Sequence, residues 1–250
     1  MQWRYDIFAK KYIAGTKLED AVKVVKELNQ KGIVATMDVL GEAISTKKEA
    51  EIAKKECLEV LDAIYKHKLN ANISVKPTQL GLVIDPDFFY VQICEILDKA
   101  KEYNNFVRID MEDSSVTTST IEMFNKIREK YDNVGIVVQA YLFRTYDDVV
   151  KLNKTGTNYR LCKGIYVEPA EIAFKGKQEV RDNYLKILDR MFEDGNYVGI
   201  ATHDDILLKE IYNKIKTKNI NKSKFEFQML YGVTEHLRDK INKDGYKIRI

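Results

Sequence analysis

The sequence has little glycine and proline, and it has no long apolar run. Gly 12 and Pro 3 together make 15 of 250 residues, about half the usual share, which predicts few turns and long elements. An all-β sandwich, with a turn about every ten residues, is therefore disfavoured. No stretch approaches the roughly 18 apolar residues of a membrane helix, and the N-terminus lacks the apolar core of a signal peptide.

Cysteine and unbalanced charge are also scarce. Cys57, Cys94 and Cys162 stand far apart without a CxxC spacing, which favours a reducing cytoplasm over a disulfide framework or a zinc knuckle. The 41 basic and 38 acidic residues leave a net charge of +3 and form no basic block, so nucleic acid is not an expected partner. A hydrophobic content of 45% is enough to bury one sizeable core. We therefore expect one soluble intracellular domain.

Short runs rich in β-branched residues recur about 20 to 40 residues apart. Most are apolar on both faces, which is typical of buried parallel strands. The predicted strands are Gly32–Leu40, Ala71–Lys76, Phe106–Met111, Val134–Tyr141, Tyr159–Tyr166, Tyr197–His203, Phe225–Leu230 and Tyr246–Ile250.

Helical patterns with start signals separate these strands, and another helix is predicted near Thr16–Gln30. The start signals are Thr46 with Glu49, Asp85-Pro86, Ser119 with Glu122, and Thr145 with Asp148. Eight strands with seven intervening helices predict an α/β fold, a (β/α)₈ TIM-type barrel. A doubly wound sheet is the second choice because no Gly-rich first turn is present.

The predicted barrel spans residues 32–250, after a helical lead-in at residues 1–31. The last predicted strand ends at Ile250, so we expect these 250 residues to lack the eighth helix.

Charged side chains lie near the carboxyl ends of the predicted strands, where barrels carry their active sites. Such residues are costly inside apolar strands unless they are paired or used, and a structural ion pair is the alternative for any single one. Their recurrence predicts a site for an anionic ligand, with Gln139 and the backbone holding a polar heterocycle. The charged residues are Lys76, Asp110, Arg160, Lys163 and His203.

Three other chemistries are weaker. Asp110, Glu112 and Asp113 form a carboxylate set that suits Mg²⁺, but basic neighbours oppose it, so no metal is expected. A Ser–His–Asp triad lacks a serine at a sharp strand–helix turn. A Schiff-base lysine with a lowered pKa remains open for Lys76 or Lys163.

The strand ends resemble a known family in order along nearly the whole chain. The run Arg160-Leu-Cys-Lys-Gly-Ile-Tyr166 resembles the Arg-Leu-Val-Lys-Gly-Ala-Tyr signature of proline dehydrogenases, with Cys162 in place of the more usual Val. The other matching motifs are Asp38-Val-Leu-Gly-Glu42, Arg108-Ile-Asp-Met-Glu-Asp113, Val138-Gln-Ala-Tyr141, Ile200-Ala-Thr-His203 and Phe225-Glu-Phe-Gln-Met-Leu-Tyr-Gly232.

The resemblance implies a distorted (β/α)₈ barrel that binds FAD without a GxGxxG turn. It implies oxidation of L-proline to Δ1-pyrroline-5-carboxylate by hydride transfer to the flavin, with electrons passed to a membrane quinone. A cytoplasmic protein with peripheral contact at the inner face of the membrane follows from that acceptor.

The resemblance also implies roles for individual residues. Gln139 is expected to hydrogen-bond the flavin edge and Arg160 to lie near the flavin N5, where a cation stabilises the reduced ring. The expected lining of the flavin is Lys163, Gly164, Thr202, His203 and Leu230. The expected substrate residues are Lys76 at the proline carboxylate, Asp110 ordering Lys76, Tyr166 against the proline ring and Glu42 at the gate.

The sequence departs from the family at its end. Family members continue after the last strand into a tyrosine loop and a helix whose Arg pair clamps the proline carboxylate. We therefore expect impaired proline binding by these 250 residues. The alternatives are an aldolase-type Schiff-base barrel using Lys163 and an inactive flavin-binding barrel.

Overall fold

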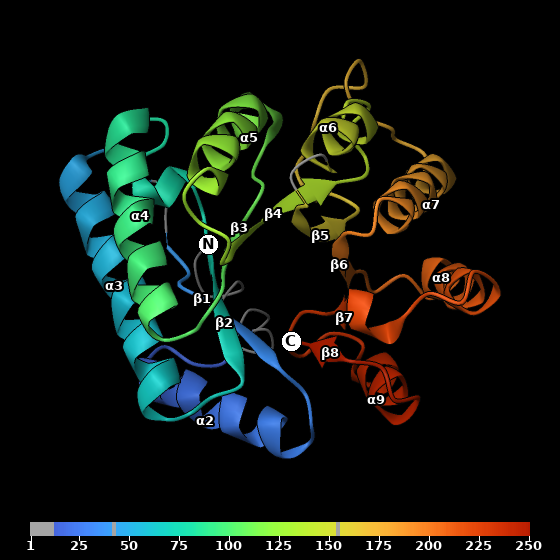
Figure 1. Cartoon of the computed structure of the whole chain (residues 1–250), viewed down its shortest axis with the longest axis horizontal. Helices are drawn as coiled ribbons and strands as arrows, with labels where there is room; N and C mark the ends of the chain where they lie inside the picture. The colour runs from blue at the N-terminus through green and yellow to red at the C-terminus, as the bar shows by residue number, and fades with distance from the viewer. Residues whose placement is uncertain (1–12, 42–43, 154–155) are drawn as a thin grey trace, which may run out of the picture.

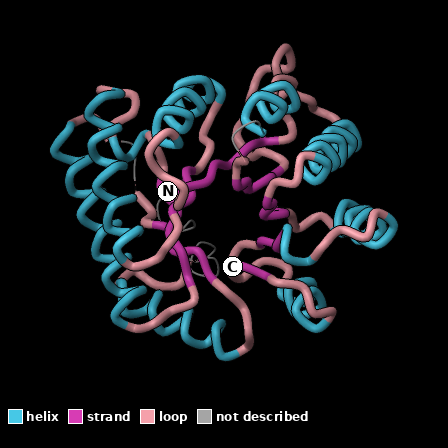
Figure 2. The backbone as a smooth tube through the Cα atoms, viewed as in Figure 1, coloured by secondary structure: helices cyan, strands magenta, loops and turns pink. Residues whose placement is uncertain are grey.

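The structure, a computed structural model, describes residues 13–41, 44–153 and 156–250. Eight parallel strands follow one another in chain order around a single sheet. Figure 2 shows them as an inner ring enclosed by an outer ring of helices. The strands are β1 (Ala35–Asp38), β2 (Ala71–Val75), β3 (Val107–Ile109), β4 (Val134–Gln139), β5 (Asn158–Cys162), β6 (Tyr197–Ala201), β7 (Phe225–Gln228) and β8 (Ile248–Arg249).

One α-helix of the described ranges precedes β1, and seven others each connect consecutive strands, as Figure 1 shows. This arrangement confirms the predicted (β/α)₈ barrel. The helices are α2 (Leu18–Gln30), α3 (Lys47–Lys66), α4 (Pro86–Glu102), α5 (Ser114–Arg128), α6 (Thr145–Leu152), α7 (Lys177–Glu193), α8 (Asp205–Thr217) and α9 (Glu235–Lys243), with short 3₁₀ turns η1 (Thr78–Leu80) and η3 (Lys222–Lys224). None of these helices is both long and apolar enough to cross a bilayer.

The last strand returns to the first and closes the ring. The backbone N–H of Thr36 donates to the carbonyl of Ile250 at 2.7 Å, and the N–H of Ile250 donates to the carbonyl of Val34 at 2.9 Å. A parallel bridge also joins Val34 to Arg249. The sheet is therefore a barrel, and its strand ends meet at two mouths.

Two of the helix starts are as predicted. Thr46 and Glu49 form the capping box of α3, and Asp85 caps α4 with Pro86 in its first turn. The apolar faces of the helices pack on the strands in one continuous core.

The other two start signals were wrong. Helix α5 begins five residues before Ser119, because the Asp113 side chain accepts from the Ser115 N–H at 2.9 Å and caps the helix there. The Thr145 hydroxyl donates to the carbonyl of Gln139 at 2.6 Å, so it ties α6 to β4 and does not cap its own helix. In α5 a residue outside the predicted motif, Asp113, caps the helix. In α6 a carbonyl outside the motif, that of Gln139, binds the hydroxyl that was expected to cap the helix.

The strands are shorter than the apolar runs that predicted them. The fifth predicted strand reached Tyr166, but β5 ends at Cys162. Beyond it Gly164 has φ +110°, and the side chain of Ile165 is 84% exposed. The residues that follow the strands leave the sheet as loops, and these loops carry the candidate site.

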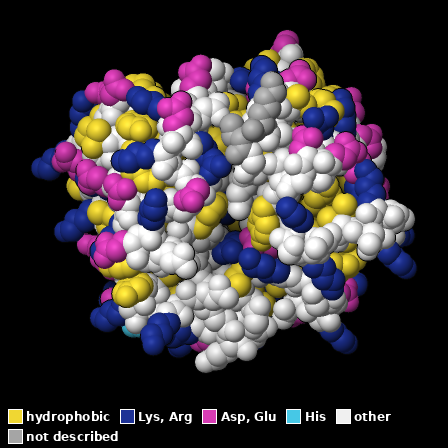
Figure 3. Space-filling model, in the orientation of Figure 1, with side chains coloured by type: hydrophobic (Ala, Val, Ile, Leu, Met, Phe, Trp, Pro, Cys, Tyr) yellow, Lys and Arg dark blue, Asp and Glu magenta, His cyan; other side chains and the backbone are white. Residues whose placement is uncertain are grey.

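The barrel interior is unusually polar, whereas branched apolar side chains fill most barrels of this kind. Glycine makes room for its charges: an added Cβ at Gly135 would lie 2.4 Å from a guanidinium nitrogen of Arg108. A Cβ at Gly199 would lie 2.3 Å from the amide nitrogen of Gln228. In the view down the barrel, Lys and Arg side chains lie around the centre of the face (Figure 3).

Candidate active site

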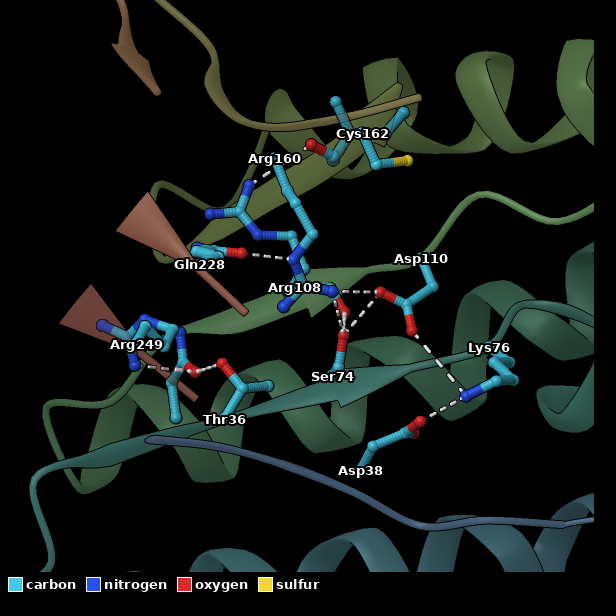
Figure 4. A network of polar contacts seen from close by, with 12 residues as sticks. Thr36, Asp38, Ser74, Lys76, Arg108, Asp110, Arg160, Cys162, Gln228 and Arg249 are labelled. Carbon is cyan, nitrogen blue, oxygen red and sulfur yellow. Dashed lines mark hydrogen bonds and ion pairs between the residues drawn. The ribbon is translucent and has the colours of Figure 1, made fainter. Parts of the chain in front are cut away.

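A chain of alternating charges crosses the carboxyl-end mouth of the barrel, as Figure 4 shows. Lys76, just after β2, contacts the carboxylate of Asp38 at the end of β1 and lies 3.7 Å from Asp110 Oδ2. The other Asp110 oxygen lies 2.8 Å from a terminal nitrogen of Arg160 on β5. Arg160 Nε donates to Gln228 Oε1 on β7 at 2.6 Å. Asp110 follows the end of β3, so five strands supply one network.

Electrostatics keep Lys76 protonated. Burial alone would lower the pKa of Lys76, but the carboxylates of Asp38 and Asp110 outweigh it and raise that pKa. Burial, together with the charge of Asp110, raises the pKa of Asp38. The idea of a Schiff-base Lys76 with a lowered pKa was therefore wrong, because two carboxylates face it where an apolar pocket was expected.

Lys163 is held by an ion pair that involves a second cation. Its amine lies 2.9 Å from Asp204 Oδ2, and Nε of Arg181 on α7 lies 2.9 Å from the same oxygen. Burial opposes ionisation of Asp204, but hydrogen bonds from Arg181 and Lys163 outweigh it and hold its pKa well below the usual range. Asp204 also caps α8, which fixes the position of this group.

His203 and Leu230 are joined across the ends of β6 and β7. His203 Nε2 accepts a hydrogen bond from the backbone N–H of Leu230 at 2.8 Å. Burial and the nearby Lys163 lower the pKa of His203, so the neutral ring with its proton on Nδ1 is favoured at neutral pH. Thr202 is buried, and its hydroxyl accepts from the backbone N–H of Asp204 at 3.2 Å.

Gln139 and Gly164 lie on neighbouring strand ends. Gln139 is buried, and its amide nitrogen donates to the carbonyl of Glu112 at 2.7 Å, so its oxygen is the atom left for a ligand. Gly164 adopts φ +110°, and an added Cβ there would lie 2.2 Å from the ring of Tyr141. Only glycine fits this backbone position without displacing that ring.

Tyr166 is exposed and lies beside the charged network. Burial and the charge of Glu112 raise the pKa of its phenol, and Lys76 and Asp110 are close enough to affect it too. The three carboxylates considered for Mg²⁺ have separate partners: Asp110 pairs with Arg160, Glu112 with Thr78 and Asp113 with α5.

All the predicted site residues except Glu42 lie at this mouth, and Glu42 lies outside the described residues. Their roles toward a flavin or a substrate stay predictions.

The sequence reasoning missed Ser74, Gln228 and Arg181 as parts of the network. Ser74 donates to Asp110 at 2.6 Å, and it precedes Lys76 by two positions on the same inward face of a strand. A period of two in polar residues within a strand would have found Ser74 and Gln228, whereas Arg181 comes from a helix and carries no such signal.

A (β/α)₈ barrel whose carboxyl-end mouth gathers cations, carboxylates and a neutral imidazole has the architecture of a barrel enzyme. The family model for proline dehydrogenase matches residues 21–250. Proline dehydrogenase 2 of Bacillus subtilis subsp. natto is 37% identical over 248 residues, which cover 99% of this chain and 82% of that protein. Proline dehydrogenase of Deinococcus radiodurans is 31% identical, with 97% and 80% covered. The chain belongs to the proline dehydrogenase family.

Solved structures agree on the fold. The crystal structure of proline utilization A (PutA) from Bdellovibrio bacteriovorus, inactivated by N-propargylglycine, superposes with a TM-score of 0.89 at 28% identity. The alignment covers 96% of this chain and 30% of that one, so this chain spans less than a third of the length of that protein. PutA from Corynebacterium freiburgense has a TM-score of 0.87 at 20% identity, which concerns the fold alone.

Proposed function

We propose that the chain binds FAD and oxidises L-proline to Δ1-pyrroline-5-carboxylate, with a quinone as the electron acceptor. The observation that carries this proposal is the network from Asp38 through Lys76 and Asp110 to Arg160, in a chain of the proline dehydrogenase family. It offers cations both for a substrate carboxylate and for the reduced state of a flavin.

The residues at the carboxyl-end mouth fit a flavin. The donor set combines cations at Arg160 and Lys163 with the amide oxygen of Gln139, while the side chain of Leu230 is 65% exposed. Gly164 keeps its backbone bare at this point, because any Cβ would meet Tyr141. Polar and apolar groups thus stand side by side, as a ring with a polar edge requires.

When bound, FAD would supply the acceptor for the hydride that leaves the carbon next to the proline nitrogen. The residues proposed to hold it are Gln139, Arg160, Lys163, Gly164, Thr202, His203 and Leu230. Arg160 supplies positive charge that favours reduction, and the neutral His203 orients the backbone of Leu230 through its 2.8 Å hydrogen bond.

On the substrate side, Lys76 is proposed to bind the proline carboxylate. Asp38 and Asp110 hold its amine from two sides, so less side-chain freedom is lost when the substrate binds. Tyr166 is proposed to bound the proline ring. The ring nitrogen must react as the neutral amine, and the side chains here orient it rather than carry out the oxidation.

The test is flavin reduction by proline. The purified chain should show flavin absorbance, and anaerobic proline should bleach it. Lys76→Met should raise the proline concentration needed for half bleaching by about tenfold or more, because a charge-assisted contact is removed. The surface variant Lys55→Met, on α3, is the matched control. Bound flavin that proline fails to bleach would instead favour an inactive flavin-binding barrel.

In this proposal Lys76 binds the proline carboxylate, and its ammonium group cannot form the bidentate ion pair that an arginine forms with a carboxylate. These 250 residues should bind proline on the order of a hundredfold more weakly than the same residues followed by a helix with the family's Arg pair. The two proteins would be compared by anaerobic titration at equal flavin content. Equal affinities would show that Lys76 suffices.

The proposed quinone acceptor suggests peripheral contact with a membrane surface. Ile165 and Val167, which follow β5, are 84% and 100% exposed, and Leu230 lies near the same mouth. Exposed apolar side chains in one region support such contact. Ile165→Asp/Val167→Asp should reduce co-flotation with lipid vesicles while proline still bleaches the flavin. Unchanged flotation would contradict the membrane contact and leave the oxidation untouched.

A further inference from the structure

A cavity lies at the amino-end mouth of the barrel, opposite the candidate active site. Its volume is about 740 Å³, within the range of small-molecule sites. Residues at the starts of strands line it, among them Ala71, Phe106, Asn158, Tyr197 and Lys247. Because the active site of a barrel lies at the carboxyl ends, this amino-end cavity is separate from the proposed flavin site.

The lining of the amino-end cavity carries an excess of positive charge. It contains five cationic side chains and one carboxylate, Glu226, within the described ranges. The cations are Lys66, Lys68, Arg108, Lys247 and Arg249. Five positive charges against one negative charge favour the entry of an anion.

The single negative charge of Glu226 cannot compensate all five cations, and both of its carboxylate oxygens already accept contacts from other side chains. Arg249 donates to both of its oxygens, at 2.5 and 3.2 Å. Gln228, Tyr197 and Lys247 also contact it, at 2.8, 3.0 and 2.9 Å. Glu226 thus pairs with Arg249 and Lys247, and within the described ranges it makes no hydrogen bond or ion pair with Arg108.

Arg108 is the buried cation without a matching carboxylate. Its side chain is 2% exposed, and its terminal nitrogens donate to Asn158 Oδ1 at 2.6 Å and to the carbonyls of Asn158 and Ile136. Among the described residues its Nε has no hydrogen-bond partner. Burial and the nearby Arg160 and Arg249 lower its pKa, as expected for a cation whose charge is under-compensated. An anion in the adjoining cavity would supply the missing charge.

We propose that the amino-end cavity binds a small anion with at least two negative charges, of the phosphate or carboxylate class. The lysines at its rim draw the anion in, and Arg108 provides the uncompensated charge beneath it. Tyr65 and Tyr103, which stack at 4.1 Å, form an aromatic part of the wall that accommodates an organic portion of the ligand.

Isothermal titration calorimetry tests the proposal, with inorganic pyrophosphate as the phosphate probe and succinate as the carboxylate probe, at 150 mM NaCl. Saturable one-site binding of either probe is expected, and the tighter one identifies the class. Lys68→Gln and Lys247→Gln should each weaken binding about threefold, and the double variant about tenfold. Lys55→Gln, on the outer surface of α3, should bind as the parent does.

Both variant lysines are exposed, so circular dichroism should show the native fold in each case. Two outcomes would overturn the proposal. One is the absence of saturable binding for both probes. The other is binding that Lys68→Gln/Lys247→Gln leaves unchanged, which would put the anion elsewhere on the protein. The measurement needs no proline turnover, so it stands or falls independently of the proposed oxidation.

Discussion

Replacing Glu226 by Gln tests how the charged interior of the barrel is held together. Glu226 is 2% exposed on β7 and accepts five contacts from four side chains. Burial alone would raise its pKa, but Arg249 and Lys247 outweigh it and lower the pKa from the ordinary 4.5 to about 2. Glutamine keeps the shape of the side chain and removes the charge.

The expected cost follows from that pKa. At about 1.4 kcal/mol per pKa unit, a carboxyl stabilised in this way contributes about 3 kcal/mol to folding at neutral pH. Leaving Arg249 and Lys247 without their carboxylate partner is expected to cost a similar amount, since breaking a buried ion pair costs about 3–5 kcal/mol. In a chain of this size the midpoint of thermal unfolding should fall by about 6–12 °C.

The pH dependence has a definite sign. Because the folded-state pKa of Glu226 is depressed, its stabilisation is complete above the unfolded pKa near 4.5. It is lost progressively as the pH falls toward about 2. The difference between the parent and Glu226→Gln should therefore shrink between pH 7 and pH 3.

Urea unfolding followed by circular dichroism at both pH values measures this difference. Glu235→Gln is the matched control, because Glu235 pairs with Arg238 at 3.0 Å while 58% exposed. It should cost less than about 1 kcal/mol. A loss below about 1 kcal/mol for Glu226→Gln at pH 7, or an equal loss at pH 3, would refute the reasoning.

Three further predictions concern the carboxyl-end mouth. Arg160→Met should make the proposed flavin harder to reduce by about 1–3 kcal/mol, and an unchanged midpoint potential would place Arg160 away from the ring. His203 should be neutral at pH 7 with its proton on Nδ1, and ¹⁵N NMR should show a pKa below the usual range for histidine. Because the folded-state pKa is depressed, the contribution of His203 to the stability of the fold is present above the unfolded pKa and lost as the pH falls. Gly164→Ala should destabilise the fold more than Gly195→Ala in urea unfolding, since both glycines have positive φ but only the first would drive a Cβ into Tyr141. Equal losses in the two variants would remove the argument from close packing.

The barrel could be predicted because its signals are local and repeated. Runs apolar on both faces mark strands buried between a core and a layer of helices, and the helical periods lie between them. Their ends could not be predicted from hydrophobicity, because Ile165 and Tyr166 look like strand residues although they follow β5 as a loop. The chain turns away from the sheet after β5, where Gly164 adopts a positive φ. The hydrophobicity of the sequence does not reveal this backbone conformation.

The sequence predicted where the residues of the candidate site lie, but it did not predict which side chains form ion pairs with one another. Lys76, Asp110 and Arg160 follow from the rule that barrel sites lie at strand ends. Their partners depend on the closure of the ring: Asp204 binds Lys163, just after β5, and Arg181 of α7, and no local spacing connects these residues. The apolar neighbours of Lys76 in the sequence are compatible with a lowered pKa, but Asp38 and Asp110 flank its amine from other strands.

The polar interior also links the two mouths of the barrel. Arg160 donates to Gln228 at 2.6 Å, Gln228 donates to Glu226 at 2.8 Å, and Glu226 accepts from Arg249 at the amino-end cavity. Gln228 uses its oxygen toward one mouth and its nitrogen toward the other, so its amide has one orientation that satisfies both. Gly199 leaves the space in which that amide lies. An apolar side chain in place of Gln228 would leave Arg160 Nε without its acceptor, although Asp110 would still bind a terminal nitrogen. The polar interior is therefore best explained by the side chains that it orients at the two mouths.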